Sequence, residues 1–241
     1  METKLIYLEH MDQYACDAKV VNVLSEDGRT VIILDQTVFY PQGGGQPYDT
    51  GVITGGHGAK FLVEEVRFVD GAVRHIGKFQ SGTFAVGDTV TCAVDIDRRQ
   101  LHSRLHSAGH VVDMGLKKLG IQWKAGKGYH FPVGSYDEYA GNLNGADTAK
   151  MRADLEAACN EVIAQHIPTK VLFMKWEDMA SVCAFVPDHI PDNKPGRVVM
   201  YGDFGIPCGG THVANLSEIK SMTIRKIKQD GPNVRVSYAV E

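Results

Sequence analysis

The sequence predicts an α+β fold, in which a small N-terminal antiparallel β-barrel precedes a layered domain with helices on an antiparallel sheet. Two observations support this prediction. The first ninety or so residues consist of short β-rich segments separated by glycine and aspartate clusters, a pattern typical of hairpins. From Asp97 onward, apolar residues recur every three or four positions, which is the period of an amphipathic helix.

The N-terminal region contains segments rich in β-branched and aromatic residues. Turn-forming clusters separate them, namely EDGR, QGGGQP, TGGHG and VDGA, which close hairpins through glycine and aspartate. The segments themselves are KLIYLE, AKVVNVL, TVIILD, TGVIT, KFLVEEVRFV, AVRHIG and DTVTCAVD. We therefore expect a barrel domain over residues 1–94, which also carries the GGGQ loop.

The remaining residues, 95–241, predict two helices and a sheet. Asp95 or Asp97 can cap the first helix and Gly120 can end it; its apolar face comprises Leu101, Leu105, Ala108, Val112, Leu116 and Leu119. A second helix is expected near residues 147–165. The intervening β-rich segments are KGYHFPV, TKVLFMKW, RVVMYGDF, SMTIRKIKQ and VRVSYAV. Helices on one antiparallel sheet satisfy this order of elements.

The composition is that of a packed globular protein, with 44% apolar residues. No apolar run reaches the roughly 18 residues that a membrane span needs, and the N-terminus lacks the layout of a signal peptide, so we expect a cytoplasmic protein. The five cysteines form no CxxC pair and are expected to stay reduced. The net charge of −4 does not indicate nucleic-acid binding, although residues 98–128 carry seven basic side chains against one acid. Charge alone favours a solvated helix face there.

Histidine spacing on the first helix predicts a metal site. His106 and His110 are four residues apart in HSAGH, and His102 precedes them by one turn; residues four apart share one helix face. His102 and His110 lie about 12 Å apart along the axis at 1.5 Å per residue, so one ion cannot bind all three. The pair is therefore either His102 with His106, or His106 with His110.

A second pair of ligands is present in IPCGGTHV. Its two glycines allow a tight turn, so that Cys208 and His212 can point at a common centre. Thiolate and imidazole together suit Zn(II). Alone, HxxxH occurs by chance on many helices and a cysteine before glycines is often simply buried, but the two pairs together favour a metal.

Several motifs resemble the free-standing alanyl-tRNA editing proteins, the AlaX family, which are related to the editing domain of alanyl-tRNA synthetase. These motifs are LDQTVFYPQGGGQPYDTG, RRQLHSRLHSAGH, KGYHFP, CGGTHV and IRKIKQDGPNVRVSY, in the order of the family. The resemblance implies a zinc site formed by His106, His110, Cys208 and His212, with His102 outside it. It also implies hydrolysis of the ester that joins a wrong amino acid, serine or glycine, to the 3′-terminal adenosine of tRNA(Ala).

The same resemblance implies catalytic roles for Gln46 and Thr37 in the pocket. Gln46 can present both a donor and an acceptor, and Thr37 matches a family threonine associated with the hydroxyl of the misplaced serine. Without the resemblance, the preferred interpretations are a tight hairpin loop for QGGGQ and an ordinary strand residue for Thr37. A closed shell of four ligands leaves little room for a metal-bound hydroxide, so we expect zinc to position the substrate, with water activation as the alternative.

Other residues receive no firm role. His130 is either a pocket residue or a packing residue, and Lys127 either contacts phosphate or is solvated. The histidines without a partner at metal-binding spacing are His57, His75, His166 and His189. Because the sequence ends soon after VRVSYAV, we expect recognition of the tRNA acceptor stem rather than the tRNA elbow. The sequence leaves the oligomeric state open, and a monomer is favoured. The remaining alternatives are another small ester or amide hydrolase and a non-catalytic tRNA-binding module.

Overall fold

A computed structural model describes residues 2–186 and 196–241, which form two compact units. Unit 1 contains Met1–Gly43 and Pro47–Leu101, and unit 2 contains Gly44–Gln46 and His102–Glu241. Within the described residues, no helix combines the length and apolar character of a membrane span. Antiparallel sheets and two α-helices confirm the predicted α+β class.

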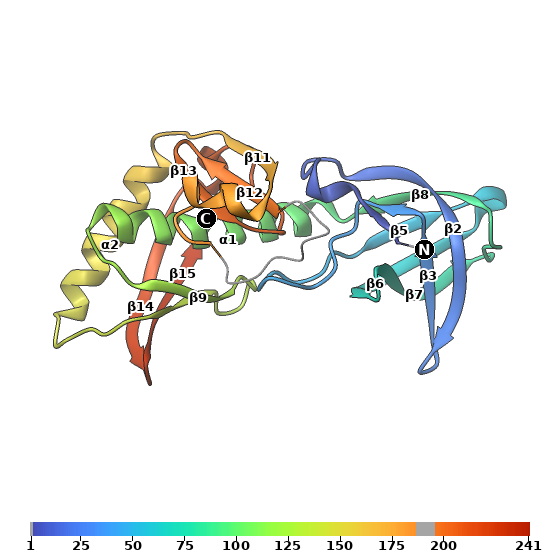
Figure 1. Ribbon diagram of the computed structural model, residues 1–241. Helices are drawn as coiled ribbons and strands as arrows, with labels where there is room; N and C mark the ends of the chain where they lie inside the picture. The colour runs from blue at the N-terminus through green and yellow to red at the C-terminus, as the bar shows by residue number, and fades with distance from the viewer. Residues whose placement is uncertain (1, 187–195) are drawn as a thin grey trace. The chain divides into compact units, whose positions relative to one another are not determined.

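Unit 1 is a closed six-stranded barrel, as predicted (Figure 1). Its strands follow the spatial order β2-β3-β7-β6-β5-β8. They comprise β2 (Ala15–Glu26), β3 (Arg29–Leu34), β5 (Gly51–Thr54), β6 (Lys60–Val69), β7 (Ala72–Ser81) and β8 (Thr89–Val94). Because the barrel is closed, every one of its strands pairs with two neighbours. The barrel therefore has no unpaired edge strand that could pair with another chain.

The first β-rich segment, KLIYLE, does not join the barrel. Only β1 (Lys4–Leu5) is extended, and it pairs in parallel with β4 (Gln36–Thr37). The chain then turns through a 3₁₀ helix at Ile6–Leu8, which buries Ile6 and Tyr7. Burial of these two side chains on one turn outweighs the β propensity of the segment.

The helix α1 (Ile96–Lys118) begins and ends as the sequence predicts. The carboxylate of Asp95 accepts a hydrogen bond from the backbone N–H of Arg98 at 3.1 Å, which caps the N-terminus. At the other end, Gly120 adopts a φ of 71° and donates to the carbonyl of Lys117. Ile121 donates to the carbonyl of Leu116. These two bonds form a Schellman motif, for which glycine is preferred because its φ is positive.

Unit 2 packs its helices on antiparallel strands. The four-stranded sheet has the order β14-β15-β10-β9, formed by β9 (Lys124–Tyr129), β10 (Tyr136–Ala140), β14 (Met222–Asp230) and β15 (Asn233–Val240). A separate three-stranded sheet contains β11 (Thr169–Met174), β12 (Gly196–Tyr201) and β13 (Phe204–Pro207). The strands predicted for one sheet are thus divided between two, because β11 and β12 pair only with each other and with β13.

Both helices of unit 2 are tied to the four-stranded sheet. Asp147 caps α2 (Thr148–Ile163) by accepting hydrogen bonds from two backbone N–H groups of the first turn. The Asn160 amide of α2 binds the backbone of Met222 in β14 in both directions, at 2.8 and 3.0 Å. On α1, the carbonyl of Leu105 accepts the Tyr238 hydroxyl of β15. These bonds hold α1 beside the strands that form the candidate site.

Candidate metal centre

Four predicted ligands converge in unit 2. His106, His110, Cys208 and His212 each offer one ligand atom, and these atoms all lie within 4.8 Å of one another. The Cys208 Sγ is 3.3 Å from His106 Nε2 and 3.6 Å from His212 Nε2. A tetrahedral zinc ion with nitrogen and sulfur ligands separates neighbouring ligand atoms by about 3.3–3.7 Å. The spacing of these side chains therefore fits a single tetrahedral ion.

One face of α1 positions the loop that carries the second pair of ligands. The hydroxyl of Ser103 bonds the hydroxyl of Thr211 at 2.9 Å, and the hydroxyl of Ser107 accepts the backbone N–H of Val213 at 3.1 Å. Gly210 permits this close approach, since a Cβ there would lie 2.1 Å from Cε1 of His106. The serines and the glycine together bring the CGGTH loop against the histidine face of the helix.

The side chain of Gln46 orients the first histidine. Its amide oxygen accepts the Nδ1–H of His106 at 2.8 Å and the backbone N–H of Thr211 at 3.0 Å, while its nitrogen donates to the Thr211 hydroxyl at 2.9 Å. Because an amide oxygen only accepts, His106 carries its proton on Nδ1, which leaves Nε2 free to bind a metal. Gln46 is fully buried and thus acts on the cluster through His106.

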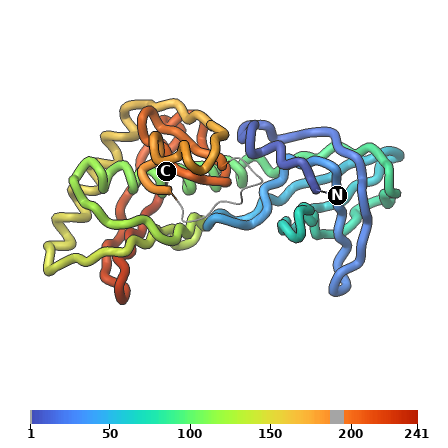
Figure 2. Tube along the Cα trace, viewed as in Figure 1, coloured from blue at the N-terminus to red at the C-terminus, as the bar shows by residue number. Residues whose placement is uncertain are grey.

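The GGGQ loop reaches this position by packing on the segment that follows β9 (Figure 2). The backbone N–H of His130 donates to the carbonyl of Gly45 at 2.8 Å. A Cβ at Gly45 would lie 2.3 Å from the carbonyl oxygen of Gly128, and its φ is 77°. Glycine is therefore required at this position for both space and backbone conformation.

Asp113 orients the second histidine. Its carboxylate lies 3.5 Å from Nδ1 of His110 and accepts the hydroxyl of Tyr139 at 2.8 Å. In metal sites, a carboxylate that accepts a hydrogen bond from a ligand histidine fixes the tautomer and the ring orientation of that histidine. Asp113 received no role from the sequence, although its i, i+3 spacing from His110 is a usable signal.

The charges of the cluster suit a cation. Burial opposes ionisation of the Cys208 thiol, but the hydrogen bond and charge of His110 outweigh it and lower the pKa of Cys208. Burial likewise disfavours a charged His110, yet Asp113 and Cys208 raise its pKa to about 10. Burial and neighbouring His130 lower the pKa of His106 well below its usual value. Without an ion, Cys208 and His110 are thus held as a thiolate beside an imidazolium. A bound zinc ion would replace the His110 proton, because zinc binds thiolate and neutral imidazole.

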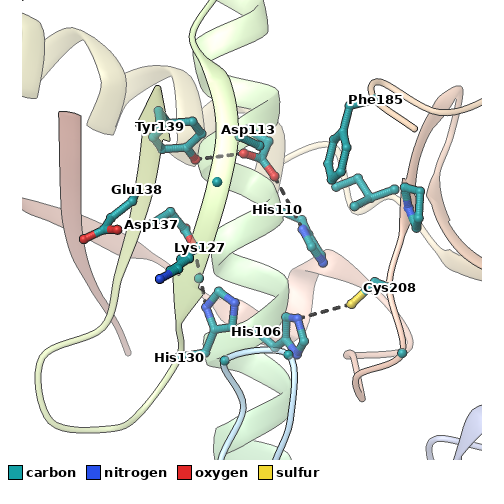
Figure 3. Close-up of a pocket in the computed structure, with 18 residues that line it drawn as sticks. His106, His110, Asp113, Lys127, His130, Asp137, Glu138, Tyr139, Phe185 and Cys208 are labelled. Atoms are coloured by element: carbon teal, nitrogen blue, oxygen red, sulfur yellow. Dashed lines mark hydrogen bonds and ion pairs between the residues drawn. The ribbon is translucent and has the colours of Figure 1, made fainter. Parts of the chain in front are cut away.

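Three of the four cluster residues, His106, His110 and Cys208, line a cavity of about 510 Å³. Figure 3 shows His106, His110 and Cys208 near one another, with a dashed line from His110 to Asp113 and another from Asp113 to Tyr139. Other residues that line the cavity are Lys127, His130 and Asp137. Its volume falls within the range of small-ligand pockets, roughly 300–1,000 Å³.

Comparison with known proteins identifies the family. The model of "tRNA synthetases class II (A)" matches residues 5–98, and that of "Threonyl and Alanyl tRNA synthetase second additional domain" matches residues 197–235. The alanyl-tRNA editing protein AlaX-M of Methanosarcina barkeri is 31% identical, over 86% of this chain and 87% of that protein. The chain belongs to the AlaX family of alanyl-tRNA editing proteins.

Longer relatives contain the AlaX-family sequence as a part. The alanyl-tRNA editing protein AlaX-L of Pyrococcus horikoshii is 30% identical over 90% of this chain and 53% of its own length. An alanine–tRNA ligase of Methanothrix thermoacetophila is 31% identical over 98% of this chain. The chain spans about a quarter of that ligase, 25% of its length.

The remaining predicted residues of this AlaX-family chain are placed as follows. Thr37 lies in unit 1, where its hydroxyl is 2.8 Å from Nε2 of His75. His75 donates from Nδ1 to the carbonyl of Ile32 at 3.0 Å, so its Nε2 accepts the Thr37 proton. Thr37 also accepts the backbone N–H of Phe39 at 3.0 Å. The predicted role of Thr37 towards serine stays a prediction, and its partner His75 was missed.

The histidines that received no firm role from the sequence lie in different environments. His130 lines the cavity, and its ring stacks on that of His106 at 4.4 Å. His102 is buried on α1 and does not belong to the four-residue cluster. Burial lowers the pKa of His75 to about 4; the inward register of β7 is the sequence signal that could have indicated its burial. His189 lies outside the described residues.

Proposed function

We propose that this chain deacylates alanine tRNA that carries serine or glycine. The observation that supports this most directly is the group of four candidate metal ligands, three of which line a cavity of about 510 Å³. The names of the AlaX-M and AlaX-L relatives, both alanyl-tRNA editing proteins, supply the substrate class.

The chemistry demanded by this reaction is modest. An aminoacyl ester is already reactive, so the protein must hold the terminal adenosine and the acyl group, admit one water and stabilise the developing oxyanion. A zinc ion bound to His106, His110, Cys208 and His212 would supply positive charge at the cavity wall. Four protein ligands favour a positioning role for that charge over generation of a metal-bound nucleophile.

The residues around the cluster keep it rigid while substrate enters. Gln46 and Asp113 hold the ring planes of His106 and His110 through their Nδ1 atoms. Loss of such a supporting hydrogen bond typically lowers metal affinity or activity about 10- to 100-fold. Under this proposal, Lys127 at the cavity contacts a phosphate of the acceptor stem, and a monomer is sufficient for the reaction. Cys208 must stay reduced to bind zinc, which suits a cytoplasmic location.

Deacylation of three charged forms of alanine tRNA tests the proposal. Purified protein is incubated with seryl-, glycyl- and alanyl-tRNA(Ala), and the remaining ester is measured over time. We expect rapid loss of the seryl ester, loss of the glycyl ester and sparing of the alanyl ester. Binding of zinc and tRNA without release of any amino acid would instead support a non-catalytic tRNA-binding module.

A further inference from the structure

Asp137 is a buried carboxylate in the cavity wall of unit 2. It occupies the second position of β10, opposite Gly128 of β9 and Val236 of β15. Residues of β10 alternate in burial, so Asp137 shares its inward face with Tyr139. An apolar residue would be ordinary at such a position. Only 8% of Asp137 is exposed.

The carboxylate lacks hydrogen-bond donors among residues 2–186 and 196–241. Its Oδ2 is buried without a partner there. The nearest basic atom is Nδ1 of His130, 3.9 Å from Oδ1, which is too far for a hydrogen bond. That nitrogen is already used: Tyr238 donates its hydroxyl proton to the carbonyl of Leu105, so the Tyr238 oxygen accepts the Nδ1–H of His130 at 2.6 Å.

Two glycines let α1 and β9 pack closely against this carboxylate and the ring of His130. A Cβ at Gly109 would lie 3.0 Å from Oδ2 of Asp137, and a Cβ at Gly128 would lie 3.0 Å from Oδ1. Side chains at either position would crowd the carboxylate from opposite elements, α1 and β9. Asp137 lines the cavity, with Oδ2 buried against Gly109 and Oδ1 left as the oxygen for a ligand.

A buried acceptor without a donor is costly, and a ligand that supplies the donor recovers that cost. Burial and the negative charge of Asp113 raise the pKa of Asp137 well above its usual value. A cationic donor offsets more of this free-energy cost than a neutral donor, since charge-assisted hydrogen bonds are about twice as strong as neutral ones. Among the groups of an aminoacyl-adenosine, only the α-ammonium is a cation.

We propose that Asp137 is the binding residue for the α-ammonium group of the aminoacyl ester. This inference rests on the proposed function and adds a requirement to it, namely that the amino group of the substrate be free. Esters whose amino group is acylated, such as those of peptidyl-tRNA, carry no charge at this position and are spared. A metal ion in the cluster would place positive charge near the carbonyl oxygen of the acyl group. The Asp137 carboxylate would place negative charge near its ammonium group.

The test compares two non-hydrolysable ligands. Both are 3′-amides of 3′-amino-3′-deoxyadenosine, one formed with serine and the other with glyceric acid, which has a hydroxyl in place of the amine. We expect the wild-type protein to bind the seryl amide about 10- to 100-fold more tightly, the value of a hydrogen-bonded charge. Asp137→Asn should bind the two amides equally, and its melting temperature should equal or exceed that of the wild type.

The control variant is Asp154→Asn, which removes an exposed carboxylate of α2 that pairs with Lys150. It should keep the wild-type preference. Equal binding of both amides by the wild type, or a preserved preference in Asp137→Asn, would overturn the inference. So would an equal loss of both amides in Asp137→Asn, because the partner would then be the nucleoside.

These measurements separate the inference from the proposed function. An amine preference that depends on Asp137, found in a protein that leaves seryl-tRNA(Ala) intact, would refute the deacylase proposal and support the ammonium site. Hydrolysis of seryl-tRNA(Ala) without an amine preference would do the opposite.

Discussion

Removal of the Gln46 side chain should weaken metal binding, although Gln46 is not itself one of the four candidate metal ligands. Gln46→Ala deletes three buried hydrogen bonds, one with His106 and two with Thr211. The ring of His106 loses the acceptor that holds its proton on Nδ1. The backbone N–H of Thr211, three residues after the candidate ligand Cys208, is left without this acceptor.

The magnitude follows from these contacts. An unsatisfied buried donor costs about 1–3 kcal/mol, and Gln46→Ala leaves two. Part of this cost falls on the fold and part on the metal site, because His106 must be reoriented when the ion binds. We expect zinc affinity to fall about 10- to 100-fold, as for comparable supporting residues, or about 1.4–2.8 kcal/mol.

Competition with a chromophoric chelator measures the zinc affinity directly. Gln46→Glu keeps an acceptor for His106 and Thr211, so it should restore most of the affinity. Gln42→Ala, in an exposed position four residues earlier on the same loop, is the matched control and should match the wild type. An unchanged zinc affinity in Gln46→Ala would refute the positioning role.

Three further predictions concern single residues. Cys208→Ala should abolish stoichiometric zinc binding, measured by elemental analysis, whereas His102→Ala should retain zinc because His102 is not part of the cluster; equal loss in both would place His102 among the ligands. Thr37→Val should slow the release of serine more than that of glycine, because a hydroxyl partner matters only for serine; equal slowing would make Thr37 structural. Burial lowers the pKa of His75 from 6.5 to about 4. As the pH falls, the unfolded state therefore protonates His75 at a higher pH than the folded state does. The free energy of unfolding should therefore decrease by about 3 kcal/mol more from pH 7 to 4 in the wild type than in His75→Gln. Parallel denaturation profiles for the two proteins would contradict the buried neutral histidine.

Local spacing predicted helix α1 and the pairs of candidate metal ligands. The period of apolar residues in α1 and its caps at Asp95 and Gly120 are properties of one helix, and the observed helix agrees with them. The histidine pair follows from the same period. The sequence alone left two histidine pairs open, and only the family resemblance selected His106 and His110.

Contacts across long sequence separations could not be predicted in this way. Gln46 meets His106 from 60 positions away, because Gly44–Gln46 pack with unit 2 although the flanking residues belong to unit 1. Asp113 was counted only as the single acid of a basic stretch, and its partner Tyr139 lies 26 residues later. Asp137 was not singled out, since its lack of donors emerges only from the packing of β10 against α1.

The dependence of deacylation on zinc tests the central claim, that the four-residue cluster serves the removal of serine from tRNA(Ala). Metal-depleted protein receives increasing equivalents of zinc, and the rate of seryl-tRNA(Ala) hydrolysis is measured at each step. The rate should rise from near zero and saturate at one equivalent per chain. A full rate in the metal-free protein, or no hydrolysis at any zinc level, would contradict the claim.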